Sequence, residues 1–275
     1  VWVRASAGTK YDQIPVIVSL PEVAGIAPGF TMYNPDPSHY TLGKDSLNIV
    51  MQKGDLYQSD NSVKNLLLYR GSFDRNNVCT TVKVDNLPIN EGGQWDTASF
   101  LLFNNADNYI SVGKKSHKAG IASVEERNGT ASEYDGDAAQ NAVSSAYLGF
   151  MKQDDTLTLA YKTDGEWQTV KTFDDASFLG SWFSIGFAAW HTNDRGKDVT
   201  FSDFKIGTAD QGFDAVSAGT ALSIGEFTNT APTVSDLKFD GKDHKVGEEV
   251  SVSYTFADAD YNRDCLLYTS DAADE

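Results

Sequence analysis

Alternation of apolar and polar residues is the strongest pattern in this sequence, and it is clearest between residues 147 and 207. Within 155–162, Leu157, Leu159 and Tyr161 alternate with Thr and Ala residues. Successive side chains of a β-strand point to opposite faces of a sheet, so this period of two predicts a strand. Asp164-Gly165 follows, and an Asp-Gly pair between two such runs predicts a tight hairpin turn. The strands expected in this stretch span 147–151, 155–162, 167–172, 183–190 and 199–206.

Further short strands are expected earlier in the chain, separated by Gly, Asn, Asp and Pro. Such a series predicts a β-sandwich or jelly roll. No segment shows a sustained period of 3.6. The polar stretch 127–145 is expected to be a long solvated loop that includes the sequon Asn128-Gly129-Thr130. The earlier strands are expected at 46–51, 65–70, 78–84, 98–104, 109–112 and 120–124.

The chain is expected to be a piece of a longer protein, because it opens within a strand-like run and has no signal peptide. Its last residues, CLLYTSDAADE, resemble a translated sequencing adapter, as expected of a metagenomic fragment. We expect an all-β organisation. Its parts are an upstream end with a linker (1–27), a β-sandwich (28–210), a linker (211–230), a partial immunoglobulin-like domain (231–264) and an artefact tail (265–275).

Charge narrows the possible partners. The chain has 22 basic and 39 acidic residues, a net charge of -17, which repels phosphate backbones and anionic membrane surfaces. No apolar run approaches the roughly 18 residues of a membrane span. Nucleic acid and membrane insertion are therefore not expected. Cys79 is expected to be buried in a strand, and no disulfide is expected because Cys265 lies in the adapter-like tail.

The order of several strand segments resembles a known family. These segments are Gly29-Phe30, Ser46-Leu47-Asn48-Ile49, Asn65-Leu66-Leu67-Leu68, Thr80-Thr81-Val82-Lys83-Val84 and Thr200-Phe201-Ser202-Asp203-Phe204. Residues 28–208 resemble the concanavalin A-like jelly-roll β-sandwich at the C-terminal end of glycoside hydrolase family 43 β-xylosidases and arabinofuranosidases. The resemblance implies a secreted or cell-surface bacterial glycosidase, in which the sandwich is accessory to an upstream catalytic domain. Segment 231–264 resembles a bacterial immunoglobulin-like repeat.

Catalysis by the sandwich itself is not expected. Retaining hydrolases of this fold need two carboxylates about 5 Å apart, carried by a Glu-x-Asp-x-x-Glu strand that we do not find. Glu125-Glu126 and Glu248-Glu249 are adjacent pairs, and neighbours on a strand cannot both face one cleft. The histidines also lack metal-ligand spacing: His39, His117, His191 and His244.

Aromatic residues are the stronger candidates for binding. Sugar rings present apolar C–H faces to Trp and Tyr rings, while carboxylates and amides bind the hydroxyls. Trp95 follows Gly92-Gly93-Gln94, where a core role is less obvious, and Trp190 ends a strand. Trp167 and Trp182 are expected in the core. The expected ligand-binding residues are Trp95, Asn105, Asp107, Tyr109, Trp190 and His191.

The resemblance also implies a structural calcium ion, with Asp203 in the closing strand as its ligand. Asp135, Asp137, Asp258 and Asp260 are weaker candidates. The expected function is a non-catalytic carbohydrate-binding or accessory module whose partner is a polysaccharide or glycan. Two alternatives stay open at this point: a structural spacer or docking domain without a ligand, and a catalytic hydrolase or lyase on the same fold.

Overall fold

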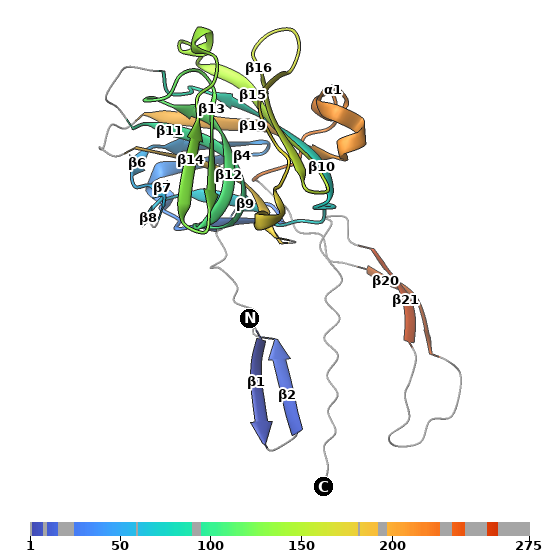
Figure 1. The fold of residues 1–275 in the computed structure, drawn as a ribbon. Helices are drawn as coiled ribbons and strands as arrows, with labels where there is room; N and C mark the ends of the chain where they lie inside the picture. The colour runs from blue at the N-terminus through green and yellow to red at the C-terminus, as the bar shows by residue number, and fades with distance from the viewer. Residues whose placement is uncertain are drawn as a thin grey trace. The chain divides into compact units, whose positions relative to one another are not determined.

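The computed structural model describes residues 2–7, 10–15, 25–58, 60–89, 95–180, 182–191, 197–225, 233–239 and 252–257 (Figure 1). The chain divides into two compact units, Val1–Glu226 and Phe227–Glu275. The five-part division expected from the sequence stays a prediction. Among the described residues, no helix is long and apolar enough to cross a membrane.

One layer of the first unit is an antiparallel sheet of seven strands. Its central strand pair joins β10 to β19, and a bulge interrupts their register after Thr81. In sheet order the strands are β17 (Gln168–Phe173), β16 (Thr156–Lys162), β15 (Ser145–Gln153), β10 (Asn77–Asp85), β19 (Asp198–Gly207), β5 (Ser46–Val50) and β4 (Tyr40–Gly43).

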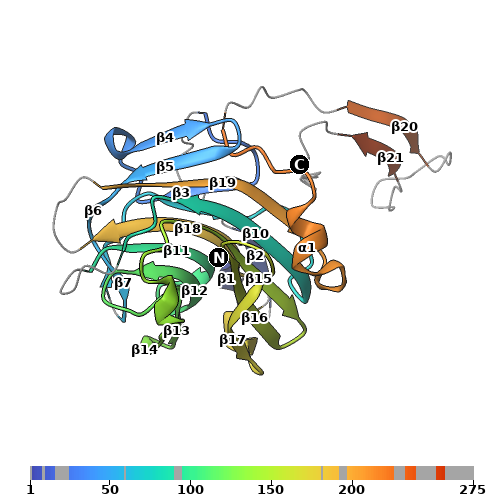
Figure 2. The same cartoon turned by 90° about the horizontal axis from the view of Figure 1, so that it is seen from above.

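The other layer is an eight-stranded sheet, and Figure 2 shows the two curved layers from above. One short strand, β6 (Gln52–Lys53), runs parallel to the end of β18. The remaining strands, in sheet order, are β14 (Thr130–Tyr134), β13 (Ala122–Arg127), β12 (Asn108–Lys115), β11 (Thr97–Asn105), β18 (Ser184–His191), β9 (Leu66–Tyr69) and β3 (Phe30–Tyr33).

Aromatic rings from both layers fill the space between the sheets. The Phe100 ring of β11 lies 4.9 Å from Phe150 of β15 and 5.5 Å from Phe187 of β18, measured between ring centroids. Phe187 meets Phe204 of β19 edge-on at 4.9 Å. All four side chains are fully buried. A period of two places every second side chain of each strand on the face between the two sheets, and these interleaved apolar side chains form the core of the sandwich.

The other elements are short. Three hairpins pair β1 (Trp2–Ala7) with β2 (Lys10–Pro15), β7 (Leu56–Tyr57) with β8 (Asp60–Asn61), and β20 (Thr233–Phe239) with β21 (Val252–Ala257). The helix α1 spans Gly212–Ser217. Single 3-10 turns occur at Pro37–His39, Ala138–Gln140, Ser177–Leu179 and Ala209–Gln211.

The all-β two-sheet sandwich predicted from the sequence is confirmed. The expected long loop at 127–145 is wrong in part, because it contains strand β14. Asn128 and Gly129 have φ values of 51° and 72°, and two consecutive positive φ angles make the tight turn that joins β13 to β14. Cys79 is buried as predicted, and Cys265 lies outside the described residues. The pairing of β20 with β21 leaves the immunoglobulin-like assignment a prediction.

Candidate functional site

One face of the eight-stranded sheet is covered by a short segment that we call the strap. It consists of residues 54–58 and 60–65, which carry the chain from β6 through the β7–β8 hairpin towards β9. The strap residues Leu56 and Val63 are fully buried in one cluster with Leu101, Tyr109 and Trp190. Because Leu101 alternates with the inward-facing Phe100, this cluster lies on the face turned away from the seven-stranded sheet.

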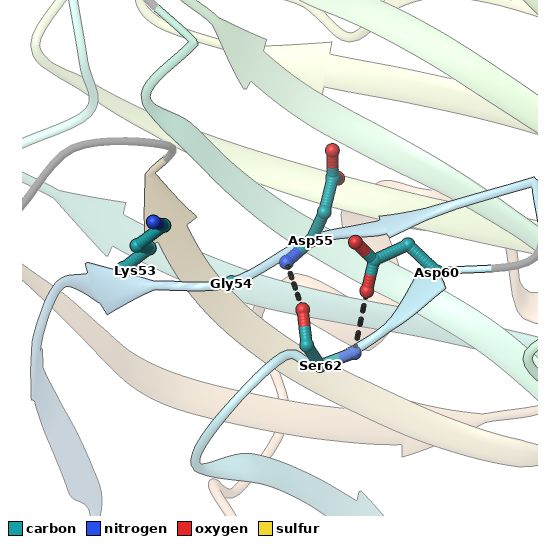
Figure 3. Close-up of a pocket in the computed structure, with 5 residues that line it drawn as sticks. All are labelled: Lys53, Gly54, Asp55, Asp60 and Ser62. Carbon is teal, nitrogen blue, oxygen red and sulfur yellow. Dashed lines mark hydrogen bonds between the residues drawn. The ribbon is translucent and has the colours of Figure 1, made fainter.

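A pocket of about 340 Å³ opens beside the strap (Figure 3). The Asp55 N–H donates to Ser62 Oγ at 3.1 Å, and the Ser62 N–H donates to Asp60 Oδ1 at 2.9 Å. The first bond joins the segment of Asp55 to the segment that carries Asp60 and Ser62, and the second lies within that latter segment, while Lys53 lies across Gly54 from Asp55. The lining residues are Lys53, Gly54, Asp55, Asp60 and Ser62.

Asp55 links this pocket to Trp190. Its Oδ1 accepts hydrogen bonds from Trp190 Nε1 at 3.0 Å and from the Leu56 N–H at 2.8 Å. Burial nevertheless raises the pKa of Asp55, because desolvation of the carboxylate outweighs these two donors. A half-buried carboxyl group with a raised pKa beside a pocket is a feature typical of binding and catalytic sites.

Two more charged side chains are buried under the strap. Glu126 is fully buried: its Oε2 accepts the Gln58 N–H at 3.0 Å, and its Oε1 has no hydrogen-bond partner. Burial raises the pKa of Glu126. Lys115 is also buried, with Nζ 3.5 Å from Glu133 Oε1, and desolvation lowers the pKa of Lys115. This face therefore holds charge where an ordinary core would be apolar.

Trp95 supplies an open aromatic ring at the same end of the sheet. It precedes β11, and Thr97 of that strand pairs with both Trp190 and Lys115. The Trp95 side chain is 51% exposed, and its ring lies 4.2 Å from the His117 ring.

His117 and two lysines surround one carboxylate behind this ring. His117 Nε2 lies 3.4 Å from Glu133 Oε1, and Lys118 Nζ lies 3.0 Å from Glu133 Oε2. The contact with His117, followed by the contact with Lys118 and the nearby lysine charges, lowers the pKa of Glu133 to about 2. An aromatic ring braced from behind by a charge network, with half its area open, is suited to stacking on a ligand.

The structure separates the predicted site residues into two groups. Trp95, Trp190 and His191 lie at the end just described, whereas Asn105 and Asp107 are exposed in the β11–β12 turn at the opposite end. There the Asp107 N–H donates to Asn105 Oδ1 at 2.9 Å, so Asn105 organises the turn.

Three predicted residues are buried instead of open to a ligand. Trp190 is 3% exposed, Tyr109 is 1% exposed with its hydroxyl donating to the Leu56 carbonyl, and His191 is 0% exposed with Nε2 3.1 Å from the Met51 carbonyl oxygen. A stacking role for the Trp190 and Tyr109 rings does not fit this placement, because protein covers them. Ligand binding by the rest of the predicted set stays a prediction.

Asp203 occupies a β-bulge. Its φ is 55°, and together with Phe204 it lies opposite Val82 of β10. The Asp203 carboxylate accepts from Lys205 Nζ at 2.8 Å and from the Tyr147 hydroxyl at 3.0 Å. Calcium needs six to eight oxygen ligands, and the described residues contain no group of three or more His, Cys, Asp or Glu side chains that could hold a metal. The residues around Asp203 therefore do not fit the predicted calcium site.

Sequence reasoning placed one tryptophan wrongly and missed the buried charges. Trp182, expected in the core, is 74% exposed, whereas Trp167 is half-buried and stacks on Phe213 at 4.7 Å. A signal for Glu126 was present: it follows Ala122 and Val124 at a spacing of two, so it shares their buried face of β13, the face covered by the strap. Nothing local in the sequence marks the strap as the cover of this face.

Similarity to known proteins is found among solved structures. No protein-family profile matches the sequence, and no curated protein sequence matches it. Among solved structures, a mutant of the GH43 protein BlXynB from Bacillus licheniformis matches with a TM-score of 0.55 and 17% identity, over 72% of this chain and 42% of that one. A bifunctional GH43-CE protein from Bacteroides eggerthii matches with a TM-score of 0.52 and 21% identity, over 66% and 25%.

This chain shares its fold with the β-sandwich region of GH43 proteins. The match spans less than half of each GH43 chain just described. A more distant likeness, with a TM-score of 0.43 and 15% identity over 68% of this chain and 99% of that one, is to the carbohydrate binding module CBM66 from Bacillus subtilis. At these identities the likeness concerns architecture, and the site has to be argued from this chain's own residues.

Proposed function

We propose that this sandwich is a non-catalytic carbohydrate-binding module of a secreted or cell-surface glycoside hydrolase. The observation that carries the proposal is Trp95, whose half-open ring rests on His117 at the end of the sheet that also bears the Asp55 pocket. A ring for the C–H face of a sugar and carboxylates for its hydroxyls are the two elements that carbohydrate recognition requires.

The proposed ligand is a neutral glycan. Asp55 and Asp60 both line the pocket, and the chain as a whole carries a net charge of -17. Sugar hydroxyls can donate hydrogen bonds to these carboxylates, whereas a uronate or sulfate would be repelled by them. A module of this kind would hold a polysaccharide close to the active site of a catalytic domain in the same protein.

A glycan array probed with the full chain tests this proposal. We expect binding to one class of neutral glycan, weak or no binding to glycans rich in uronate, and a clearly weaker signal for Trp95→Ala. Ile89→Ala removes another exposed apolar side chain, 40% exposed, and serves as the matched control that should bind normally. A blank array from folded protein would contradict the proposal and favour a docking or spacer module.

The same array, repeated with a chelator, addresses the predicted calcium. Because Lys205 already neutralises the Asp203 carboxylate, we expect binding to be unchanged when calcium is removed. Chelator-sensitive binding would return calcium to the site and would point to ligands other than Asp203.

A further inference from the structure

Trp182 stands out at the other end of β18. It precedes the strand by two residues and is 74% exposed, against 51% for Trp95 and 40% for Ile89, which are the other exposed large hydrophobic residues among those described. Tryptophan is usually well buried, so a ring this open needs an explanation.

Arg75 holds the Trp182 ring in place. The Arg75 Nε donates to the Phe183 carbonyl at 2.9 Å, which fixes the guanidinium. The guanidinium carbon lies 4.3 Å from the Phe73 ring centroid and 5.5 Å from that of Trp182. Cation–π contacts of this kind orient an aromatic ring. A ring that is already oriented loses less conformational entropy when it binds a ligand.

The surroundings of Trp182 are polar. Asp74 and Asn76, which flank Arg75, are exposed, and so are Asn104 and Asn105 at the end of the neighbouring strand β11. Phe103 pairs with Ser184 in the β11–β18 register, which brings that end of β11 beside the start of β18. Neither Trp95 nor Ile89 belongs to these segments, so Trp182 stands as a single open ring within a polar rim.

This composition favours a sugar over a protein partner. A stable protein interface buries roughly 1,200–2,000 Å² around an apolar centre, and no second exposed large hydrophobic residue of the described chain adjoins Trp182 in these segments. A sugar ring needs one aromatic face and hydrogen-bonding groups around it. The Asp74 carboxylate has a second oxygen besides the one that accepts the Asn76 N–H, and the Asn104 amide has a second N–H besides the one that donates to the Leu179 carbonyl.

We propose that Trp182 is a second glycan-stacking platform, separate from Trp95, so that the module attaches to polysaccharide at two points. This inference rests on the proposed glycan-binding function. The β11 residues level with the two ends, Thr97 and Phe103, are six positions apart, or about 20 Å of extended strand. Two attachment points strengthen binding to a polymer through avidity, whereas a short oligosaccharide occupies each point by itself.

The test uses the full chain, its Trp95→Ala, Trp182→Ala and double variants, and the probes xylohexaose, arabinohexaose and cellohexaose. Indole N–H resonances in ¹⁵N–¹H spectra report each tryptophan separately. We expect one hexasaccharide to shift the Trp95 and Trp182 resonances, and the Trp182 resonance to shift still in Trp95→Ala. On the corresponding insoluble polysaccharide, each single variant should bind roughly tenfold more weakly, equivalent to ~1.4 kcal/mol, and the double variant should not be retained.

The outcomes separate this inference from the proposed function. If Trp182→Ala binds polysaccharide as the wild type does while Trp95→Ala does not, the second platform is refuted and the first stands. If Trp182→Ala alone abolishes binding, Trp182 is a platform and the placement at Trp95 is refuted. If the wild type binds no probe and no polysaccharide, both fail. Trp182→Phe, which keeps an aromatic face, should retain most of the binding lost in Trp182→Ala.

Discussion

The two faces of the eight-stranded sheet differ in what they bury. The face turned towards the seven-stranded sheet is filled by phenylalanine rings such as Phe100 and Phe187. The opposite face, under the strap, buries Glu126 and Lys115 together with the hydrogen-bonded ring of Trp190. Apolar burial stabilises at about 25 cal/mol per Å², whereas a buried charge costs free energy unless it is fully paired.

This contrast supports the proposed position of the binding site. Glu126 Oε1 has no hydrogen-bond partner, so the strap-covered face departs from the rule that buried polar groups are satisfied. Such departures tend to occur at functional sites. The open ring of Trp95 and the Asp55 pocket lie at the end of this same sheet, which is why we place the ligand there.

The largest effect on stability is expected on the face of the eight-stranded sheet that is filled by phenylalanine rings. Phe187→Ala removes a ring that contacts Phe100 in the same sheet and Phe201 and Phe204 across the sandwich. We expect the free energy of unfolding in urea to fall by about 3–5 kcal/mol. A loss below about 1 kcal/mol would show that this face does not dominate stability, and the comparison between the two faces would break down.

A smaller, local effect is expected where the strap meets the sheet. Tyr109→Phe removes the hydroxyl that donates to the Leu56 carbonyl and leaves that carbonyl unsatisfied. We expect a loss of about 1–2 kcal/mol, with faster amide hydrogen exchange in the strap and unchanged exchange in β15 and β19. Exchange that rises equally in both sheets would mean that the strap does not open separately from the core.

Glu126→Gln tests the comparison between the two faces through the pH dependence of stability. Since burial raises the folded-state pKa of Glu126, the folded protein keeps a proton that the unfolded chain has already released. Stability contributed by this group is therefore present below the ordinary glutamate pKa and lost as the pH rises through the raised value.

Thermal unfolding between pH 4 and pH 8 measures this effect. We expect Glu126→Gln to flatten the fall in stability with pH and to gain about 1 kcal/mol at neutral pH, because a neutral amide is less costly to bury than a carboxylate. Glu166→Gln, an exposed glutamate in the β16–β17 turn, is the matched control and should leave the profile unchanged. An unaltered profile for Glu126→Gln would show that its carboxylate is solvated or paired in solution.

The smallest effect on stability is expected at Trp95. Because half of its side chain is exposed, Trp95→Ala should change the free energy of unfolding by less than about 0.5 kcal/mol. Urea unfolding of the variant checks this. A loss of several kcal/mol would make Trp95 a structural residue, and its effect on binding would then be uninterpretable.

Period-two alternation was enough to predict the sandwich. Within a core strand the apolar residues recur at every second position, and these are the buried positions. Strand β16 alternates as Leu157, Leu159 and Tyr161, and all three are buried. Strand β14 was missed because its burial is partial and its residues are polar, although the Asn128-Gly129 turn marked its start.

The candidate site could be predicted only in part. Trp95 was found from its place after a glycine-rich loop, and it is open as expected. The covered rings of Trp190 and Tyr109 could not be foreseen, because their cover comes from the strap, which is distant in sequence and has no regular pattern. Trp182 was misjudged because exposure of a tryptophan beside a core strand depends on where that strand begins, and strand ends are set by pairing with other strands.

The most direct test of the central claim is calorimetric titration with the three neutral hexasaccharides in a Trp182→Ala background, which leaves Trp95 as the only proposed platform. The background chain is compared with its Trp95→Ala variant and with its Trp95→Tyr variant, which keeps an aromatic face. We predict that one hexasaccharide binds the background chain, binds Trp95→Tyr within a fewfold, and binds Trp95→Ala at least roughly tenfold more weakly, a difference of ~1.4 kcal/mol. Equal affinity with and without the Trp95 ring would contradict the claim that this end of the sheet is a glycan-binding site.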